Sequence, residues 1–247
     1  MKGVIVATAV DHRPWHEARR GVPATADASN RPLIDHVIEA FVQAGFEELC
    51  VVVGHNGEIL RQYLEDSSRY GIAVYCLYNP RYVWGSATSV YAARAFVRGE
   101  RFVVAVADHP TSACSLSLLL QRHWTSHVLC VQQRRGGGAT SRTAIRVGLD
   151  PWGRVEGVGR ALKRWQAVST GVYLFQPHAF DTWRGSGQQP GARGSITGLV
   201  RRILEAGEVV DACDTSALLR QALLLRSEHL RQRPMLTVGL SREELVA

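Results

Sequence analysis

The residues Phe102-Val103-Val104-Ala105-Val106-Ala107-Asp108-His109-Pro110 carry the clearest structural signal in this chain. Their apolar run is short and rich in valine, which predicts a strand buried on both faces, as in a parallel sheet. The run ends in a carboxylate, and ligands of open α/β sheets bind just beyond the carboxyl ends of strands. Asp108 is therefore a candidate for holding a metal or a phosphate, although strand-end aspartates also commonly cap the next turn or helix.

Strands and helices alternate through the N-terminal half of the chain. Apolar runs typical of strands alternate with segments whose apolar residues recur at spacings of three and four, which indicates amphipathic helices. This alternation predicts an α/β fold with a doubly wound, mostly parallel sheet and right-handed crossovers. The predicted strands are 1–9, 49–53, 72–77 and 102–107, the predicted helices are 33–45 and 57–70, and shorter strand-like segments follow at 128–131 and 144–147.

Composition is that of a globular protein, and the length suits one large α/β domain or one domain with an insertion. The chain has 247 residues, of which 46% are hydrophobic, so a full core can form. No apolar run approaches the roughly 18 residues that would span a bilayer, and the N-terminus lacks the pattern of a signal peptide. The five cysteines form no CxxC pair. Cys50, Cys76 and Cys130 lie in strand-like surroundings and are predicted to be buried thiols in a reducing cytoplasm.

The net charge of +7 raises the question of a nucleic-acid surface. The basic residues are mostly arginines scattered along the whole chain, and neither an aromatic-plus-basic RNA motif nor a recognition-helix pattern is present. A site for anionic small molecules, such as nucleotides and phosphates, accounts for part of the excess. We therefore expect no nucleic-acid partner and no membrane insertion.

The order of motifs along the chain resembles the nucleotidyltransferases that join a nucleoside triphosphate to a phosphorylated sugar, polyol or amino alcohol. The segment 79–91 has an asparagine and a tyrosine before a glycine, and then a serine that opens a helix. With Ala107-Asp108-His109, it is most similar to the choline-phosphate and inositol-1-phosphate cytidylyltransferases. The segments that carry the resemblance are Arg31-Pro32-Leu33-Ile34-Asp35-His36, 46–55, 79–91, Ala107-Asp108-His109, 157–162, 169–175 and Cys213-Asp214-Thr215.

The resemblance implies a Rossmann-like, GT-A-type mixed sheet flanked by helices, in a single domain over residues 1–247. Residues 1–125 would form the nucleotide-binding half and 126–210 the acceptor-binding half. Residues 211–247 would supply a metal aspartate and a C-terminal helix.

The implied activity is transfer of a nucleoside monophosphate, with CTP favoured over other triphosphates, to a small phosphorylated alcohol. Inositol 1-phosphate and phosphocholine lead as acceptors, and pyrophosphate leaves. Such chemistry depends on positioning and charge neutralisation more than on covalent help. The resemblance also implies Mg²⁺ as cofactor and a cytoplasmic enzyme, and it leaves a homodimer open.

The family pattern assigns roles to particular residues of this chain. Arg13, Asp108 and Asp214 are the expected catalytic residues, and both aspartates are the expected metal ligands within reach of one ion. The nucleotide is expected to contact Ala7, Ala9, Arg13, Gly54, Gly85, Ser86, Ser89 and Asp108, and the acceptor to contact His109, Arg160, Lys163, Thr170 and Gly171.

Plainer interpretations of several of these residues stay open. Asp214-Thr215-Ser216 is also an ordinary N-cap sequence, and Ser89 can equally be a plain helix cap. Arg160 and Lys163 can belong to a solvated face, and His109 can orient its neighbours.

The first loop departs from the family pattern. It reads Ala7-Thr8-Ala9-Val10-Asp11-His12-Arg13, without the two glycines that let backbone N–H groups cradle phosphates. Pro23-Ala24 stands where the family has proline and lysine, so Arg13, Arg19 or Arg20 would have to replace that positive charge. The alternative function is a catalytically impaired domain that binds a nucleotide or a protein partner without turnover.

Overall fold

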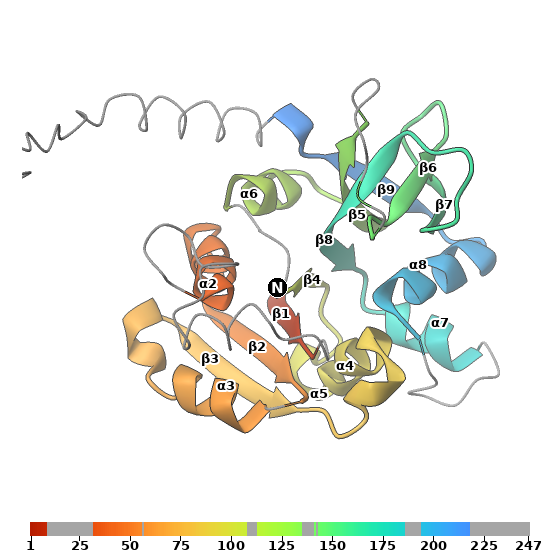
Figure 1. Cartoon of the computed structure of the whole chain (residues 1–247). Helices are drawn as coiled ribbons and strands as arrows, with labels where there is room; N and C mark the ends of the chain where they lie inside the picture. Colours follow the sequence, from red (N-terminus) through yellow and green to blue (C-terminus); the bar gives the residue numbers. More distant parts are fainter. Residues whose placement is uncertain are drawn as a thin grey trace, which may run out of the picture.

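The computed structural model describes residues 1–8, 32–55, 57–107, 113–134, 141, 143–185 and 194–217. They form a mixed nine-stranded sheet with helices on both faces (Figure 1). The main path of strands runs in the order β3-β2-β1-β4-β8-β5-β9, and the β6–β7 hairpin joins it through β8. The predicted doubly wound, mostly parallel α/β sheet is confirmed.

The N-terminal half of the sheet is entirely parallel. Its central strand, β1, pairs with β2 on one side and with β4 on the other, and β3 forms the edge beyond β2. Because side chains alternate along a strand, Val4 and Val6 enter the core on one face while Ile5 enters the core on the other. These strands are β1 Lys2–Ala7, β2 Glu48–Val53, β3 Ala73–Tyr78 and β4 Phe102–Val106.

One antiparallel strand joins this parallel half to the rest of the sheet. β8 (Ala167–Phe175) lies between β4 and β5 and runs antiparallel to both, while β9 runs parallel to β5. The carboxyl ends of β1, β4, β5 and β9 consequently meet at one edge of the sheet. The remaining strands are β5 His127–Gln133, β6 Arg146–Leu149, β7 Val155–Gly159 and β9 Val210–Asp214.

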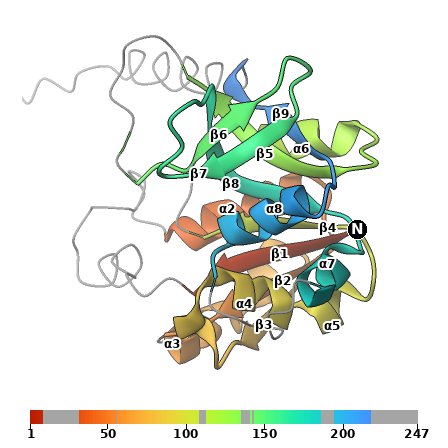
Figure 2. The same ribbon diagram turned by 90° about the vertical axis from the view of Figure 1, so that its right-hand side faces the viewer.

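Two helical layers bury the two faces. α2, α3 and α6 cover one face, and α4, α5, α7 and α8 cover the other, as the two hydrophobic clusters and Figure 2 show. Each long helix carries one apolar side, which is the pattern expected of a helix that packs on a sheet. The helices are α2 Leu33–Gln43, α3 Gly57–Leu64, α4 Ser86–Ala92, α5 Arg94–Val97, α6 Ala113–Gln121, α7 Ala179–Gly185 and α8 Ile196–Glu205.

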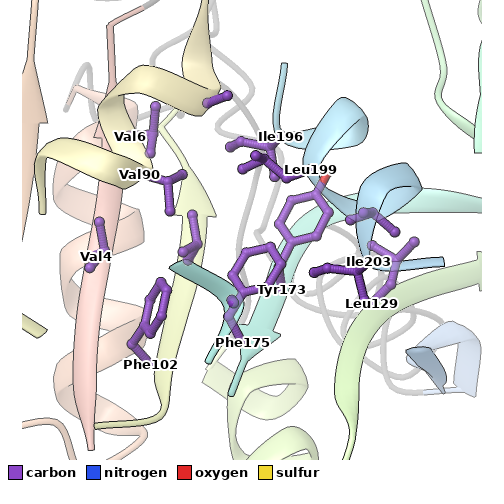
Figure 3. Packing of buried hydrophobic residues seen from close by; sticks show 14 of the residues in the cluster. Val4, Val6, Val90, Phe102, Leu129, Tyr173, Phe175, Ile196, Leu199 and Ile203 are labelled. Carbon is purple, nitrogen blue, oxygen red and sulfur yellow. The ribbon is translucent and has the colours of Figure 1, made fainter. Parts of the chain in front are cut away.

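Aromatic rings close the core where β4 meets β8. The Phe102 ring lies 5.6 Å from Phe175 and 5.2 Å from Phe180, and Tyr173 stacks on Phe175 at 5.9 Å (Figure 3). Each of these four side chains is at most 4% exposed. Truncating a buried ring of this kind to alanine typically costs about 3–5 kcal/mol of stability. The packing therefore ties the two halves of the sheet into one body.

The thiols in the strands are structural. Cys50 and Cys130 are buried as predicted, whereas Cys76 is only half-buried because β3 is an edge strand. Burial raises the pKa of Cys50 to about 12 and that of Cys76 to about 11. Both therefore stay protonated and unreactive at neutral pH.

The helix predicted over 57–70 is shorter than expected. α3 ends at Leu64, and a separate 3₁₀ turn, η1, covers Ser67–Tyr70. Asp66 between them has φ −82° and ψ 70°, and its carboxylate accepts a hydrogen bond from the Ser68 hydroxyl. Such local side-chain bonds compete with helix formation. None of the described helices is both long and apolar enough to cross a membrane.

Candidate active site

A cavity of about 690 Å³ opens at the carboxyl ends of β1 and β4. This is the edge at which open α/β sheets bind ligands. Val6, Thr8 and Val106 form its floor, and further walls come from the loop before α4, from the β7–β8 region and from the start of α8. Of the predicted site residues, Gly85, Ser86, Arg160 and Gly171 all line it. Residues predicted for the nucleotide and residues predicted for the acceptor thus share one cavity.

The wall near the loop before α4 is built from backbone. Gly85 has φ 110° and ψ 166°, a conformation that is essentially reserved for glycine. A Cβ atom on Gly85 would lie 2.2 Å from the carbonyl oxygen of Gly194. The close approach lets Gly194 O accept from Ala87 N–H at 3.0 Å, while Gly194 N–H donates to Trp84 O at 2.8 Å.

A hydrogen bond to the Ser86 side chain adds to these backbone contacts. We call the bonds of Trp84, Ser86 and Ala87 with Gly194 and Ile196 the clasp. Ser86 Oγ accepts a hydrogen bond from the Ile196 N–H at 3.1 Å, so it caps the entry to α8. Ser195 makes the regular N-cap contact, because its Oγ accepts from Gly198 N–H at 3.1 Å. The clasp therefore fixes the start of α8 against the start of α4.

Ser89 lies beneath the cavity and does not line it. Its side chain is 0% exposed, and it is neither the N-cap of α4, which is Gly85, nor a surface of the pocket. Its Oγ lies 2.8 Å from Thr8 Oγ1 and 3.0 Å from Asn79 Nδ2. The serine thus connects the end of β1 to the segment that follows β3.

Arginine side chains line the opposite wall. Arg160 follows β7, and Arg201 comes from α8, where its Nε donates to the Val158 carbonyl at 2.8 Å. The guanidinium of Arg201 also packs over Gly159, whose added Cβ would meet it at 2.3 Å. Two guanidinium groups on one wall, with hydroxyls of Ser169 and Thr197 beside them, favour an anionic ligand.

Of the other predicted acceptor residues that the structure describes, Gly171 lines the cavity, whereas Thr170 and Lys163 do not. Gly171 lines the cavity with φ 80°, and its N–H donates to Ser169 Oγ at 3.1 Å. Thr170 points the other way and donates to the Cys130 carbonyl at 3.1 Å, in the strand pairing of β8 with β5. Lys163 is exposed and is not among the residues that line the cavity.

Gly54 lies on a neighbouring hollow of about 470 Å³, which has Tyr82 in common with the main cavity. A Cβ on Gly54 would lie 2.6 Å from Tyr82 Cβ, so the glycine makes room for that ring. Glu58 and Arg61 form a 2.6 Å ion pair on the hollow's wall. The position of Gly54 therefore supports the site through packing of Tyr82.

Asp214 ends β9 as predicted and also acts as a cap. Its Oδ1 accepts hydrogen bonds from the Ser216 N–H at 2.9 Å and from the Ser216 hydroxyl at 2.5 Å. Strand pairing places Asp214 in the same row as Val131 and Ser169, two strands from the cavity wall. At the usual strand spacing this is roughly 10 Å between the Cα atoms of Asp214 and Ser169. Asp214 is exposed, so its other carboxylate oxygen can still face a cation.

Of the remaining predicted residues, Ala7 is the one that the structure describes. Ala7 is the last residue of β1 and is half-buried. Ala9, Arg13, Asp108 and His109 lie outside the residues that the structure describes. Their expected roles, and the expected approach of Asp108 to Asp214, stay predictions.

A second cluster of titratable groups lies at the opposite edge of the sheet. Glu208 Oε2 lies 3.0 Å from His127 Nε2 and 2.7 Å from His178 Nε2, and the three side chains are close enough to share a metal ion. However, His127 Nδ1 accepts the Gln176 N–H at 3.2 Å. In the neutral ring this puts the proton on Nε2, where a metal ligand would need a lone pair. The hydrogen-bonded arrangement thus favours a structural lock over a metal centre.

The protonation states in this lock follow from burial and hydrogen bonding. Burial lowers the pKa of His127, although its contact with Glu208 opposes that shift. Burial raises the pKa of Glu208, but hydrogen bonds from Thr182, His127 and His178 outweigh it and leave that pKa lowered. A neutral His127 therefore donates to a charged Glu208 at neutral pH.

Sequence reasoning missed Thr8 and Arg201, which both line the cavity. Thr8 lies in the strand predicted over 1–9, among small residues, and nothing in that segment marks its hydroxyl as part of a site. Arg201 lies in the amphipathic helix α8, a segment that carried no motif in the sequence. Its approach to the cavity depends on the docking of α8 against β7, which no local pattern encodes.

Comparison with known proteins finds relatives in sequence and in fold. A family model described as a MobA-like NTP transferase domain matches residues 24–194, well over half of the chain. The "Bifunctional IPC transferase and DIPP synthase" of Rubrobacter xylanophilus is 33% identical over 183 residues, which is 74% of this chain and 40% of that protein. "Low-salt glycan biosynthesis nucleotidyltransferase Agl11" of Haloferax volcanii is 24% identical over 86% of this chain and 59% of its own length. The chain thus spans only part of these relatives.

Two solved structures share the fold. The inositol-1-phosphate CTP transferase from T. maritima superposes with a TM-score of 0.70 at 16% identity, covering 86% of this chain and 84% of that one. A putative glucose-1-phosphate thymidylyltransferase from Bacillus anthracis, solved with a sucrose, gives the same TM-score and identity over 87% of both chains. The fold is therefore shared by proteins whose titles name different nucleotides.

Proposed function

Since the chain belongs to the MobA-like NTP transferase family, we propose that it transfers a cytidylyl group from CTP to a small phosphorylated alcohol. The observation that supports this most is the shared cavity. The Gly85–Ser86 segment, which resembles the base-facing segment of cytidylyltransferases, lines the same cavity as Arg160, Arg201 and Gly171. A nucleotide and an anionic acceptor would meet there at the carboxyl edge of β1 and β4.

The choice of substrates rests on the relative and on the motifs. The two solved structures match equally well, so the fold does not decide between CTP and dTTP. The 33% identical relative is named for an IPC transferase activity, and the segments 79–91 and 107–109 resemble cytidylyltransferases. Inositol 1-phosphate is accordingly the first acceptor in the proposal, and phosphocholine is the second.

The proposed reaction is an in-line displacement. A phosphate oxygen of the acceptor attacks the α-phosphorus of the nucleotide, the bond from the α-phosphorus to the bridging oxygen breaks, and pyrophosphate leaves with that electron pair. Arg160 and Arg201 would hold the acceptor's phosphate, as fixed charges on one wall. Arg13 would contact the leaving phosphates.

Mg²⁺ is the proposed cofactor. A carboxylate oxygen suits this cation, and Asp214 presents one on the correct edge of the sheet while its Oδ1 caps Ser216. Asp108 would supply the second carboxylate. The bound ion would offset charge on the phosphates.

The domain division is part of the same proposal. Residues 1–125 would bind the nucleotide, 126–210 the acceptor, and 211–247 would add Asp214 and a C-terminal helix. We further propose that the enzyme is cytoplasmic. We also propose a homodimer, which sedimentation would test.

The direct test measures pyrophosphate release with Mg²⁺, using each of the four triphosphates against a panel of phosphorylated alcohols. We expect turnover with CTP and inositol 1-phosphate or phosphocholine, and less with UTP. Arg13→Ala should lower turnover by about two orders of magnitude, and Arg13→Lys should recover only part of it. Nucleotide binding without turnover on any acceptor would instead support the impaired, binding-only domain, which the missing loop glycines and lysine favour.

A further inference from the structure

Thr8, Ser89 and Asn79 form a chain of buried hydrogen bonds beneath the cavity. Thr8 is 4% exposed, Asn79 is 3% exposed and Ser89 is 0% exposed. Buried polar groups almost always have hydrogen-bond partners, so the geometry shows which atom is the donor in each of these hydrogen bonds.

The Asn79 amide fixes the starting point. Its Oδ1 accepts the Arg81 backbone N–H at 2.9 Å, and a backbone N–H can only donate, so this atom must be the oxygen. The amide nitrogen then faces the hydroxyls of Thr88 at 2.9 Å and Ser89 at 3.0 Å. Both hydroxyl oxygens therefore accept a hydrogen bond from the Asn79 amide.

The direction of the chain follows from the serine. Ser89 Oγ accepts from Asn79, and its own proton needs an acceptor in a fully buried position. Among the residues that the structure describes, Thr8 Oγ1 at 2.8 Å is the acceptor within reach. Ser89 thus donates to Thr8 Oγ1. The hydroxyl proton of Thr8 then has no acceptor among the described residues.

The Thr8 hydroxyl can direct that proton into the cavity. The side chain of Thr8 lines the cavity, and no described residue other than Ser89 bonds to its hydroxyl. Tyr82, Gly85 and Ser86, the segment proposed to face the base, line the same cavity, and Ser89 on the helix that Ser86 opens bonds to Thr8. We infer that the Thr8 hydroxyl donates a hydrogen bond to an acceptor atom on the base of the bound nucleotide. This inference rests on the proposed function.

The chemistry makes the contact directional. A donor at this position bonds to a carbonyl oxygen or to an unprotonated ring nitrogen of a pyrimidine. Asn79 is the positioning residue, because its amide forces Ser89 to donate toward Thr8. Asn79→Asp replaces that donor by an acceptor, so Ser89 would turn its proton to the carboxylate and Thr8 would donate to Ser89.

The test uses calorimetry with Mg²⁺ and two probes, CTP and inorganic tripolyphosphate. Thr8→Val keeps the side-chain shape but removes the donor, and should weaken CTP binding about three- to tenfold. It should leave tripolyphosphate binding unchanged, because that probe has no base. Thr8→Ser should restore CTP affinity. Thr182→Val, which removes a hydroxyl bonded to Glu208 at the far edge of the sheet, should leave both affinities unchanged.

Asn79→Asp should weaken CTP binding as Thr8→Val does, and the double variant should lose little more. Equal CTP affinity in wild type and Thr8→Val would overturn the inference, and so would equal loss of CTP and tripolyphosphate binding, which indicates a distorted loop. If wild type binds no nucleotide at all, the proposed function itself fails.

Discussion

Gly85→Ala is expected to open the clasp between α4 and α8. The added Cβ would lie 2.2 Å from Gly194 O, which is backbone and cannot rotate away. Holding alanine at φ 110° costs about 1–3 kcal/mol. The bonds from Ala87 N–H to Gly194 O and from Gly194 N–H to Trp84 O contribute about 1 kcal/mol each. The free energy of unfolding should fall by about 3–5 kcal/mol in total.

The assay is thermal unfolding followed by circular dichroism, with transfer kinetics on the folded variant. The loss corresponds to a Tm lowered by about 6–20 °C for a chain of this length. Gly45→Ala is the matched control: Gly45 also has a positive φ, 89°, but nothing lies within 4 Å of an added Cβ. It should cost only about 1–2 kcal/mol, with unchanged kinetics. If the two variants unfold at the same temperature with the same kinetics, Gly85 is needed only for its own backbone angle, and the clasp contributes nothing.

Three further outcomes are expected. Arg201→Ala should raise the acceptor KM in steady-state kinetics by about tenfold or more, with little effect on the CTP KM. Arg202→Ala, on the same helix but outside the cavity lining, should leave the acceptor KM unchanged. Equal effects of the two substitutions would remove Arg201 from the acceptor wall. Asp214→Asn keeps the oxygen that caps Ser216, so its Tm should match that of wild type while its turnover falls. Asp214→Ala should lose both turnover and about 1 kcal/mol of stability. Full activity in Asp214→Asn would mean that the residue acts only as a cap. The lowered pKa values of His127 and Glu208 mean that the unfolded chain takes up these protons first, so the stability they contribute is lost as pH falls below about 6.5 for His127 and below about 4.5 for Glu208. Glu208→Gln removes the second titration, so urea titrations should show a smaller pH dependence of stability below about pH 4.5. An equal dependence in that window would contradict the lock.

Much of the fold could be predicted because its signals are local. The valine-rich run 102–107 predicted a strand buried on both faces, and β4 is buried throughout except at its last residue. Helix α2 ends within two residues of Gly45, as the glycine indicated. The helix predicted over 57–70 was too long, since Asp66 and Ser68 bond to each other and favour a turn.

The site was less accessible to sequence reasoning because it depends on packing between distant segments. Gly85 and Ser86 were recognised from a motif, but their clasp with Gly194 joins residues far apart in the chain. Ser89 was expected at the pocket, yet it lies below it, where its hydroxyl serves Thr8. Thr170 faces Cys130 because alternation along β8 sends neighbouring side chains to opposite sides, and that register is set by the partners of β8.

The central place of β8 has a consequence for synthesis of the chain. β4 can pair with β1 as soon as residues 1–106 exist, but its other edge stays unpaired until residues 167–175 have left the ribosome. An exposed edge of consecutive valines is a template for pairing with other chains. If β1 to β4 pair during translation, they form a four-stranded intermediate in which one edge of β4 lacks its partner. Chaperones would have to shield that edge. A fragment that stops before β8 should form aggregates, whereas the described helices α2 and α3 would already be in place.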